Sequence, residues 1–227
     1  MKTKVLMALA CLISSQANAH QAGDWIIKAG SISVQPNVDS DPVDVAGLAT
    51  FPNGVDVGNE VQLGLTGAYM LTDRWGIELL AASPFSHDIT LTDVPLNAGN
   101  TKQLPPTLSL QYYPEFGSEK FNPFVGLGLN NTIFFEESVS DDLNSALDGI
   151  VSLPAGSVDA ELDLDNSVGL AAQIGLDYMI SEHILINGTI WWIDIDTKAT
   201  IYTAVADVTF DVDIDPFVYL LSIGYRF

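Results

Sequence analysis

The sequence has little positive charge and a single cysteine. Its 227 residues contain eight lysines and arginines against 29 aspartates and glutamates, for a net charge of −21 at pH 7. Nucleic acid is excluded as a partner, because phosphate binding needs a basic surface. Beyond residue 19 no run of about 18 uncharged apolar residues occurs, which excludes a helical membrane protein. Apolar residues still make up 48% of the chain, so extensive disorder is excluded as well.

The first 19 residues have the features of a secretory signal peptide. Lys2 and Lys4 precede an apolar run, Val5 to Ile13, that is too short to span a bilayer. Ala17-Asn18-Ala19 matches an A-x-A cleavage site, so we predict a mature chain of residues 20–227 that begins at His20. This mature chain has no cysteine, so its stability in an oxidising compartment cannot come from disulfides.

The mature chain alternates between apolar residues and small or polar ones. In residues 58–70 the side chains of Val61 and Leu65 share one face, and those of Gln62 and Thr66 share the other. A period of two is that of a β-strand. Eight segments of this kind lie near residues 24–35, 58–70, 75–86, 104–113, 123–135, 167–179, 183–196 and 217–227.

Two features favour a membrane barrel over a soluble sandwich, which also alternates. The face opposite the apolar one carries Gly, Ser, Thr and Gln with few charges, which fits a narrow lumen better than a solvated surface. Aromatic residues lie near the ends of the segments, where outer-membrane barrels carry interfacial girdles. They are Trp25, Tyr69, Trp75, Tyr112, Tyr178, Trp192, Tyr225 and Phe227.

The connections between the segments alternate in length. Three are short, at 71–74, 114–122 and 180–182, and four are long, at 36–57, 87–103, 136–165 and 197–212. Short turns on one side and long loops on the other predict an all-β fold, an eight-stranded antiparallel up-and-down transmembrane β-barrel with four long extracellular loops. Most acidic residues fall in those loops, and Ser140 to Asp148 is predicted to form a short helix within the third.

Several motifs resemble the outer membrane protein W (OmpW) family. The mature start His20-Gln21-Ala22-Gly23-Asp24-Trp25 and the end Gly224-Tyr225-Arg226-Phe227 are similar to the termini of that family. Between them lie, in the order of the family, further similar stretches that together span the mature chain. They are Gly76–Ala82, Pro84–His87, Leu104–Thr107, Pro123–Gly126 and Trp191–Asp196.

The resemblance implies an outer-membrane barrel that passes small hydrophobic molecules through a narrow, rather apolar lumen and releases them sideways into the membrane. The family has a constriction formed by a Leu and a Trp, which map to Leu80 and Trp191 of this sequence. Eight strands leave an interior that side chains can just fill, so a wide aqueous pore is not expected. A plugged structural or surface-receptor barrel without transport is the alternative.

Charged residues within the predicted strands are expected to face the lumen. A charge on the lipid face at mid-depth costs roughly 2–4 kcal/mol. We predict polar lumen positions at Lys28, Glu60, Glu78 and Arg226, with Lys28 or Arg226 paired to Glu78 or Glu60. Pro105-Pro106 opens the fourth strand, and because proline cannot donate to a strand ladder the pair predicts either a lateral opening in the wall or a simple loop-to-strand boundary.

The last strand ends in an aromatic residue, as the terminal strands of outer-membrane barrels usually do. Tyr225 and Phe227 are therefore predicted to serve as the signal read by the barrel assembly machinery, with mere packing of a last strand as the other interpretation. The further partners we expect are outer-membrane lipid, lipopolysaccharide and small hydrophobic ligands in the outer membrane of a Gram-negative cell.

No motif of an enzyme or of a dedicated metal site occurs. The sequence contains no G-x-S-x-G or H-E-x-x-H, and Ser86-His87-Asp88 is a weak catalytic candidate, since Ser and Asp are common in loops. Residues 159–165 alternate acidic and apolar side chains without the glycine turn of a calcium loop, so they fit solvated loops or a strand extended above the membrane. We therefore expect no catalytic, cofactor or metal residues.

Overall fold

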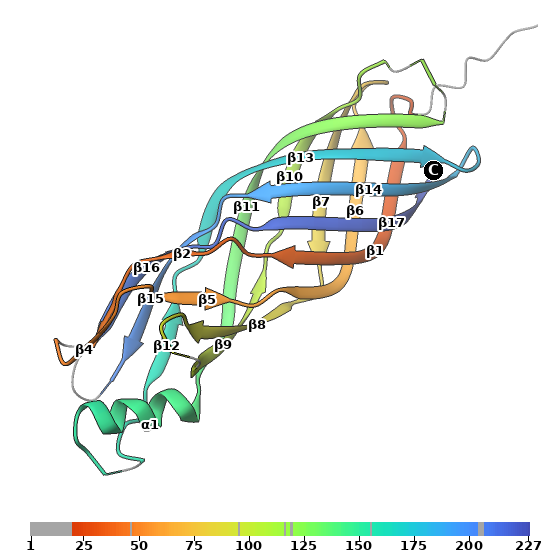
Figure 1. Ribbon diagram of the computed structural model, residues 1–227. Coiled ribbons are helices and arrows are strands. Elements are labelled where there is room, and N and C mark those ends of the chain that lie inside the picture. The colour runs from red at the N-terminus through yellow and green to blue at the C-terminus, as the bar shows by residue number, and fades with distance from the viewer. Residues whose placement is uncertain are drawn as a thin grey trace, which may run out of the picture.

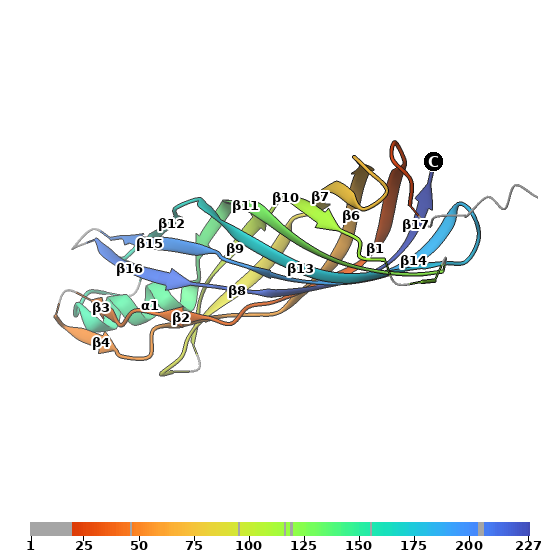
Figure 2. The same ribbon diagram turned by 90° about the horizontal axis from the view of Figure 1, so that it is seen from above.

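A computed structural model gives the architecture of residues 20–227, apart from residues 46, 95, 116, 119, 155 and 204–206. The predicted signal peptide, residues 1–19, lies outside the described residues. The molecule is an elongated barrel with a strand-rich extension at one end (Figure 1), and the view from above shows the same long axis (Figure 2). No helix of the described residues is long and apolar enough to cross a membrane.

Eight antiparallel strands close the barrel. Each pairs with the next along the chain, β17 pairs with β1, and β10 pairs with both β7 and β11, so no edge is left open. The predicted fold class is confirmed. The strands are β1 (Trp25–Gln35), β6 (Glu60–Met70), β7 (Trp75–Ala82), β10 (Thr107–Tyr112), β11 (Phe121–Val139), β13 (Ser167–Met179), β14 (Ile184–Ile193) and β17 (Phe217–Arg226).

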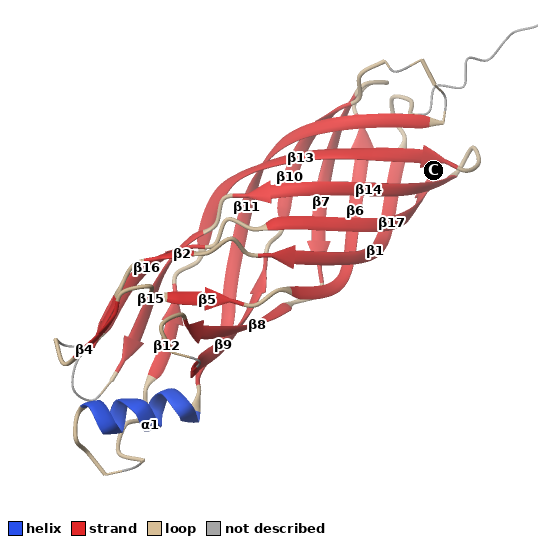
Figure 3. Cartoon of the chain, viewed as in Figure 1, coloured by secondary structure: helices blue, strands red, loops and turns tan. Residues whose placement is uncertain are grey.

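The predicted long loops contain more strand than the sequence suggested. Within 87–103 and 197–212, the described residues mostly form two antiparallel strand pairs, β8 with β9 and β15 with β16, that continue the barrel wall above the membrane and are coloured red like the barrel in Figure 3. The elements of this extension are β2 (Asp39–Ser40), β3 (Val43–Val45), β4 (Ala49–Phe51), β5 (Val55–Val57), β8 (Phe85–Leu91), β9 (Leu96–Leu104), β12 (Glu161–Leu164), β15 (Asp196–Tyr202) and β16 (Val208–Asp213). Their outward residues, such as Asp88 and Asp211, are exposed and charged, which places the extension in water.

A single helix among the described residues covers the far end of the extension. α1 (Asp141–Ile150) begins after Ser140, whose Oγ accepts a hydrogen bond of 3.0 Å from the N–H of Leu143. This is a serine N-cap, the residue type that best satisfies the first free N–H groups of a helix. Leu143 and Leu147 are buried against the extension. The helix predicted at 140–148 is confirmed and runs two residues further.

The outer face of the barrel is apolar over the height of the membrane. Leu127, Val168 and Leu221 point outward and are 72%, 75% and 68% exposed. Their neighbours along each strand lie on the inward face and are buried or half-buried, as period two requires. An outer barrel face made of large apolar side chains is stable only in contact with hydrocarbon.

Aromatic pairs ring the end of the barrel where β1 begins and β17 ends. Trp25 contacts Tyr69 with ring centroids 5.0 Å apart, and Trp75 contacts Tyr112 at 4.8 Å. The N–H of Phe227 donates to the carbonyl of Trp25 at 2.8 Å, and this hydrogen bond holds the C-terminus at this rim. Aromatic girdles mark the membrane interface, and the short turns make this the periplasmic one.

Candidate ligand channel

An apolar cavity of about 300 Å³ lies inside the extension. Its walls come from strands β3, β4, β5, β8, β9, β11, β12, β15 and β16 and from helix α1, which are far apart in the sequence. Aliphatic and aromatic side chains make up nearly all of the lining. Examples are Val45, Phe51, Ile89, Phe134, Leu147 and Phe210. A volume of this size admits a small molecule, and the lining suits an apolar one.

A layer of large apolar side chains, the floor, packs against the cavity walls from the side of the barrel. Leu80 and Trp191, the predicted constriction, both point inward and are 3% and 1% exposed. They belong to the same apolar cluster as Ile32, Ile193 and Leu220 and as the cavity walls. Leu80 lies on β7 and Trp191 on β14, and these strands are four places apart in the closed order of eight, so the layer is built from opposite sides of the barrel.

A polar layer fills the barrel below these apolar side chains. Lys28 Nζ lies 2.7 Å from Glu78 Oε2 and 4.0 Å from Asp177 Oδ1, and all three side chains are buried. Lys28 also lies over the ring of Phe124, with Nζ 5.2 Å from the centroid. One buried cation between two carboxylates is a compact ion network. Of the predicted pairings, the one between Lys28 and Glu78 is present.

Asp177 joins this network to the periplasmic end of the chain. Its carboxylate accepts from Asn187 Nδ2 at 2.7 Å and lies 3.0 Å from His20 Nε2. The hydroxyl of Tyr113 lies 3.1 Å from Gln111 Oε1 and 3.4 Å from Asp177 Oδ2. A second apolar cluster, formed by Ile26, Ala68, Met70, Tyr113, Phe124, Met179 and Leu185, packs at this end of the barrel. Side chains therefore fill the straight path to the periplasm.

The other two predicted lumen charges lie at opposite ends of the barrel. Glu60, at the start of β6, is half-buried and opposite Val34, and its Oε2 accepts from the N–H of Val61. Arg226, at the end of β17, has Nη1 3.7 Å from Asp24 Oδ2 at the periplasmic rim. Both lie away from the pair of Lys28 and Glu78. Alternation predicts the face of a residue but not its position along the barrel axis, so the sequence could not separate these charges.

The wall is interrupted beside Pro105 and Pro106. Pairing between β7 and β10 ends with Leu80 opposite Thr107, and pairing between β8 and β9 resumes with Phe85 opposite Gln103. Residues 81–84 and 104–106 lie between these points, and within the described register they do not pair with each other. On the other side the wall is continuous, since the N–H of Asn131 donates to the Pro106 carbonyl at 3.0 Å.

The weak catalytic candidate at residues 86–88 does not converge. His87 points into the cavity and is 1% exposed. Ser86 Oγ and Asp88 Oδ1 instead both contact the amide of Asn100 on the outside of the wall. Successive residues of a strand face opposite sides, so the three side chains cannot act on one substrate.

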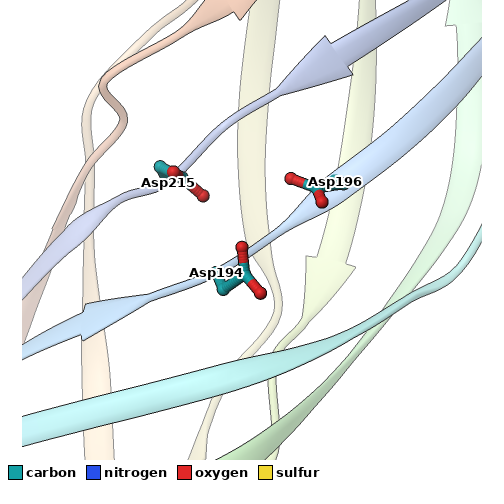
Figure 4. Close-up of side chains that lie close together, drawn as sticks. All are labelled: Asp194, Asp196 and Asp215. Atoms are coloured by element: carbon teal, nitrogen blue, oxygen red, sulfur yellow. The ribbon is translucent and has the colours of Figure 1, made fainter.

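Three carboxylates gather where the barrel meets the extension (Figure 4). The side chains of Asp194, Asp196 and Asp215 bring one oxygen each to within 4.8 Å of the others. Partial burial and then the charges of Asp194, Asp213 and Asp215 raise the pKa of Asp196 above its ordinary value. The cluster therefore concentrates negative charge on the strand links 194–196 and 214–216, just beyond the membrane-facing surface.

The comparison with protein families decides the relationship. The model of the OmpW family matches residues 21–227. The chain belongs to the OmpW family. It is 41% identical to Outer membrane protein W of Vibrio cholerae over 227 residues, which is 98% of this chain and 97% of that protein. The crystal structure of OprG from Pseudomonas aeruginosa matches with a TM-score of 0.78 at 40% identity, over 92% of this chain and 98% of that one.

The fold is shared more widely than the sequence. The solid-state NMR structure of AlkL in lipid bilayers matches with a TM-score of 0.64 at 21% identity, over 100% of this chain and 97% of that one. The resemblance to the OmpW family and the outer-membrane location predicted from the sequence are confirmed. This OmpW-family chain is an outer-membrane β-barrel, and its reported relatives are barrel proteins of that membrane rather than enzymes.

Two members of the buried network were not predicted as lumen residues. His20 lies outside the alternating segments, so the sequence pattern gave no face for it, whereas Tyr113 ends the segment 104–113 on the same face as Gln111 but was given no role there. An aromatic residue on the inward face near a strand end was the signal that could have identified Tyr113. The predicted alternation does include Asp177, at the periplasmic end of β13.

Proposed function

We propose that this protein is a passive channel that admits small hydrophobic molecules from outside and releases them sideways into the outer membrane. One observation carries the proposal: an apolar cavity of about 300 Å³ lies above a filled barrel and beside an interruption in the pairing of the wall. A molecule in this cavity finds apolar contacts on most sides, and the filled barrel below turns it toward the wall.

Straight passage is disfavoured by the two layers below the cavity. Leu80 and Trp191 form the apolar floor, and Lys28 with its two carboxylates forms the polar layer beneath it. A hydrophobic molecule gains nothing by entering a desolvated ion network, and breaking that network is costly. In this proposal Leu80 and Trp191 are the constriction that holds the ligand at the level of the exit.

The exit we propose lies at Pro105 and Pro106. Just below this level Leu79 and Leu108 are 50% and 55% exposed on the outer face, and just above it Asp88 is exposed. The interruption is therefore at the outer boundary of the hydrocarbon, where an apolar molecule is stabilised as soon as it leaves the cavity. Neither proline has an N–H to close the ladder.

Uptake of a hydrophobic dye by cells with an intact lipopolysaccharide layer tests the proposal. We expect expression of the protein to raise the initial rate of uptake. Replacing Pro105 and Pro106 together by Ala supplies two N–H groups that can pair, so we expect the rate to fall toward that of cells without the protein. Leu80→Ala and Trp191→Ala change the floor of the cavity and are expected to alter the rate. Unchanged uptake in all of these variants would contradict the channel.

The same experiment addresses the second candidate, a plugged structural or surface-receptor barrel. The filled lumen of this chain favours that candidate in one respect, because the ion network closes the barrel whatever the cavity does. A plugged barrel predicts the same rate of dye uptake with and without the protein.

We also propose that the end of β17 serves in assembly. Tyr225 and Phe227 point outward, are 45% and 65% exposed, and contact each other with ring centroids 4.7 Å apart. Both rings are thus accessible to the barrel assembly machinery before the strand meets lipid. Replacing Phe227 by Ala should lower the amount of folded barrel in the membrane, and replacing Phe121 by Ala at the same rim is the control.

A further inference from the structure

One corner of the apolar cavity is polar. His87 on β8 and Thr101 and Gln103 on β9 line the cavity from two neighbouring strands. His87 lies directly opposite Thr101, and Gln103 is two residues further toward the interruption of the wall. Each of the three is at most 3% exposed. Small-molecule pockets typically combine a mainly apolar wall with a few polar groups that fix the orientation of the ligand.

The hydrogen bonds of this corner leave one acceptor unused. His87 Nδ1 lies 2.7 Å from the carbonyl oxygen of Gly58, which can only accept, so Nδ1 carries the ring proton. Burial lowers the pKa of His87, and this effect exceeds the opposite one of the Gly58 carbonyl, Glu60 and Asp88. The ring is therefore neutral at pH 7, and its Nε2 is an acceptor.

The amide of Gln103 completes this arrangement. Its Nε2 lies 2.9 Å from His87 Nε2 and donates to it. The amide oxygen Oε1 is then fixed as an acceptor, and it is buried without a hydrogen-bond partner among the described residues. A buried acceptor that lacks a donor is destabilising, and a ligand that supplies a donor removes that cost.

We propose that His87, Thr101 and Gln103 make the cavity selective for apolar molecules that carry one hydrogen-bond donor, with aliphatic alcohols as the substrate class. The proposal rests on the function proposed above. The hydrocarbon chain packs against the Val, Leu and Phe side chains of the wall, and the hydroxyl donates to Gln103 Oε1. His87 is a positioning residue, because it holds the amide of Gln103 through Nε2.

The place of the corner in the wall agrees with this role. Gln103 is the last residue of β9 that pairs with β8 before residues 104–106. The hydroxyl of a bound alcohol is therefore held at the proposed exit while its chain remains in the cavity. Release into the membrane then exchanges one hydrogen bond to Gln103 for hydrogen bonds to the lipid headgroups.

Two isomers of one formula test the selectivity: 1-octanol, which has a donor, and 1-methoxyheptane, which has none. We expect cells that express the protein to take up the alcohol about tenfold faster than the ether, after the rates of cells without the protein are subtracted. This ratio corresponds to about 1.4 kcal/mol. Gln103→Met removes the acceptor at similar volume and should bring the ratio close to one.

The matched control is Gln35→Met, the same substitution at the exposed end of β1, outside the cavity lining. It should keep the ratio of the wild type. Heat-modifiable mobility on gels shows whether each variant is folded, and the wild-type ratio tests the proposal even if Gln103→Met does not fold. Protein-dependent uptake of both isomers at equal rates would overturn the selectivity alone. Uptake that does not depend on the protein would overturn the channel itself.

Discussion

Removing the buried lysine of the polar layer should strongly destabilise the barrel. Lys28→Met keeps an unbranched apolar side chain, one atom shorter, but leaves Glu78 and Asp177 without their cation in a buried site. The attraction between charges 4 Å apart is about 4 kcal/mol at an effective dielectric constant of 20. Loss of one partner of a buried ion pair typically costs about 3–5 kcal/mol, and we expect a loss of that size in the free energy of unfolding.

Urea unfolding of the barrel in lipid vesicles, followed by heat-modifiable mobility, measures this loss. The double variant Lys28→Met with Glu78→Met should recover most of the stability, because an apolar pair replaces the ion pair and Asp177 keeps Asn187 and His20. Lys198→Met is the control, since Lys198 is exposed and its pair with Asp211 lies on the surface, and it should change little. A Lys28→Met variant as stable as the wild type would refute the reasoning.

Three further predictions concern the surface of the barrel and its extension. Leu127→Arg places a charge at mid-height on the lipid face and should cost about 2–4 kcal/mol in the same unfolding assay, whereas a loss near zero would remove Leu127 from the hydrocarbon. The pKa of Asp196 is raised in the folded state, so the folded protein binds more protons than the unfolded chain. Its free energy of unfolding should therefore rise as the pH falls from 7 toward the ordinary aspartate pKa of about 3.9, and Asp196→Asn should flatten that dependence. Ser140→Ala removes the N-cap of α1 and should cost about 0.5–2 kcal/mol of local stability, visible as faster hydrogen exchange in 141–150 and absent from β15.

The strands and their faces could be predicted from the sequence because the membrane imposes a strict rule on each residue. Leu127 and Leu129 must contact lipid and Gly126 and Gly128 must not, so a period of two is sufficient to orient β11. The same rule made Lys28 and Glu78 inward residues, since either charge on the lipid face is costly. Those positions agree with the structure because the argument needed only one strand at a time.

The extension was predicted as loops because that rule ends where the hydrocarbon ends. Residues 208–213 alternate as regularly as any barrel strand, with Val208, Phe210 and Val212 inward and charged or polar residues outward. In water the outer face carries acids, so the pattern of a membrane strand is lost although the strand continues. Alternation therefore gave the membrane-spanning part of each strand rather than its full length.

The cavity could not be predicted, because it is formed by residues that no local pattern connects. Val45, Phe134, Leu147 and Phe210 come from four separate parts of the chain and meet only when the extension is folded. The polar corner at His87 and Gln103 depends in the same way on the pairing of β8 with β9. The helix at 141–150 was predictable in contrast, because its cap and its buried face are local.

The most direct test of the channel is to fill the cavity. Ala98 lines the cavity and is 8% exposed, so Ala98→Trp places a large ring within about 300 Å³ of space. Leu127→Trp adds a tryptophan on the lipid face as the control. We predict that uptake of a hydrophobic dye falls to the level of cells without the protein for Ala98→Trp and keeps the wild-type rate for Leu127→Trp. Wild-type uptake by a folded Ala98→Trp barrel would contradict the account.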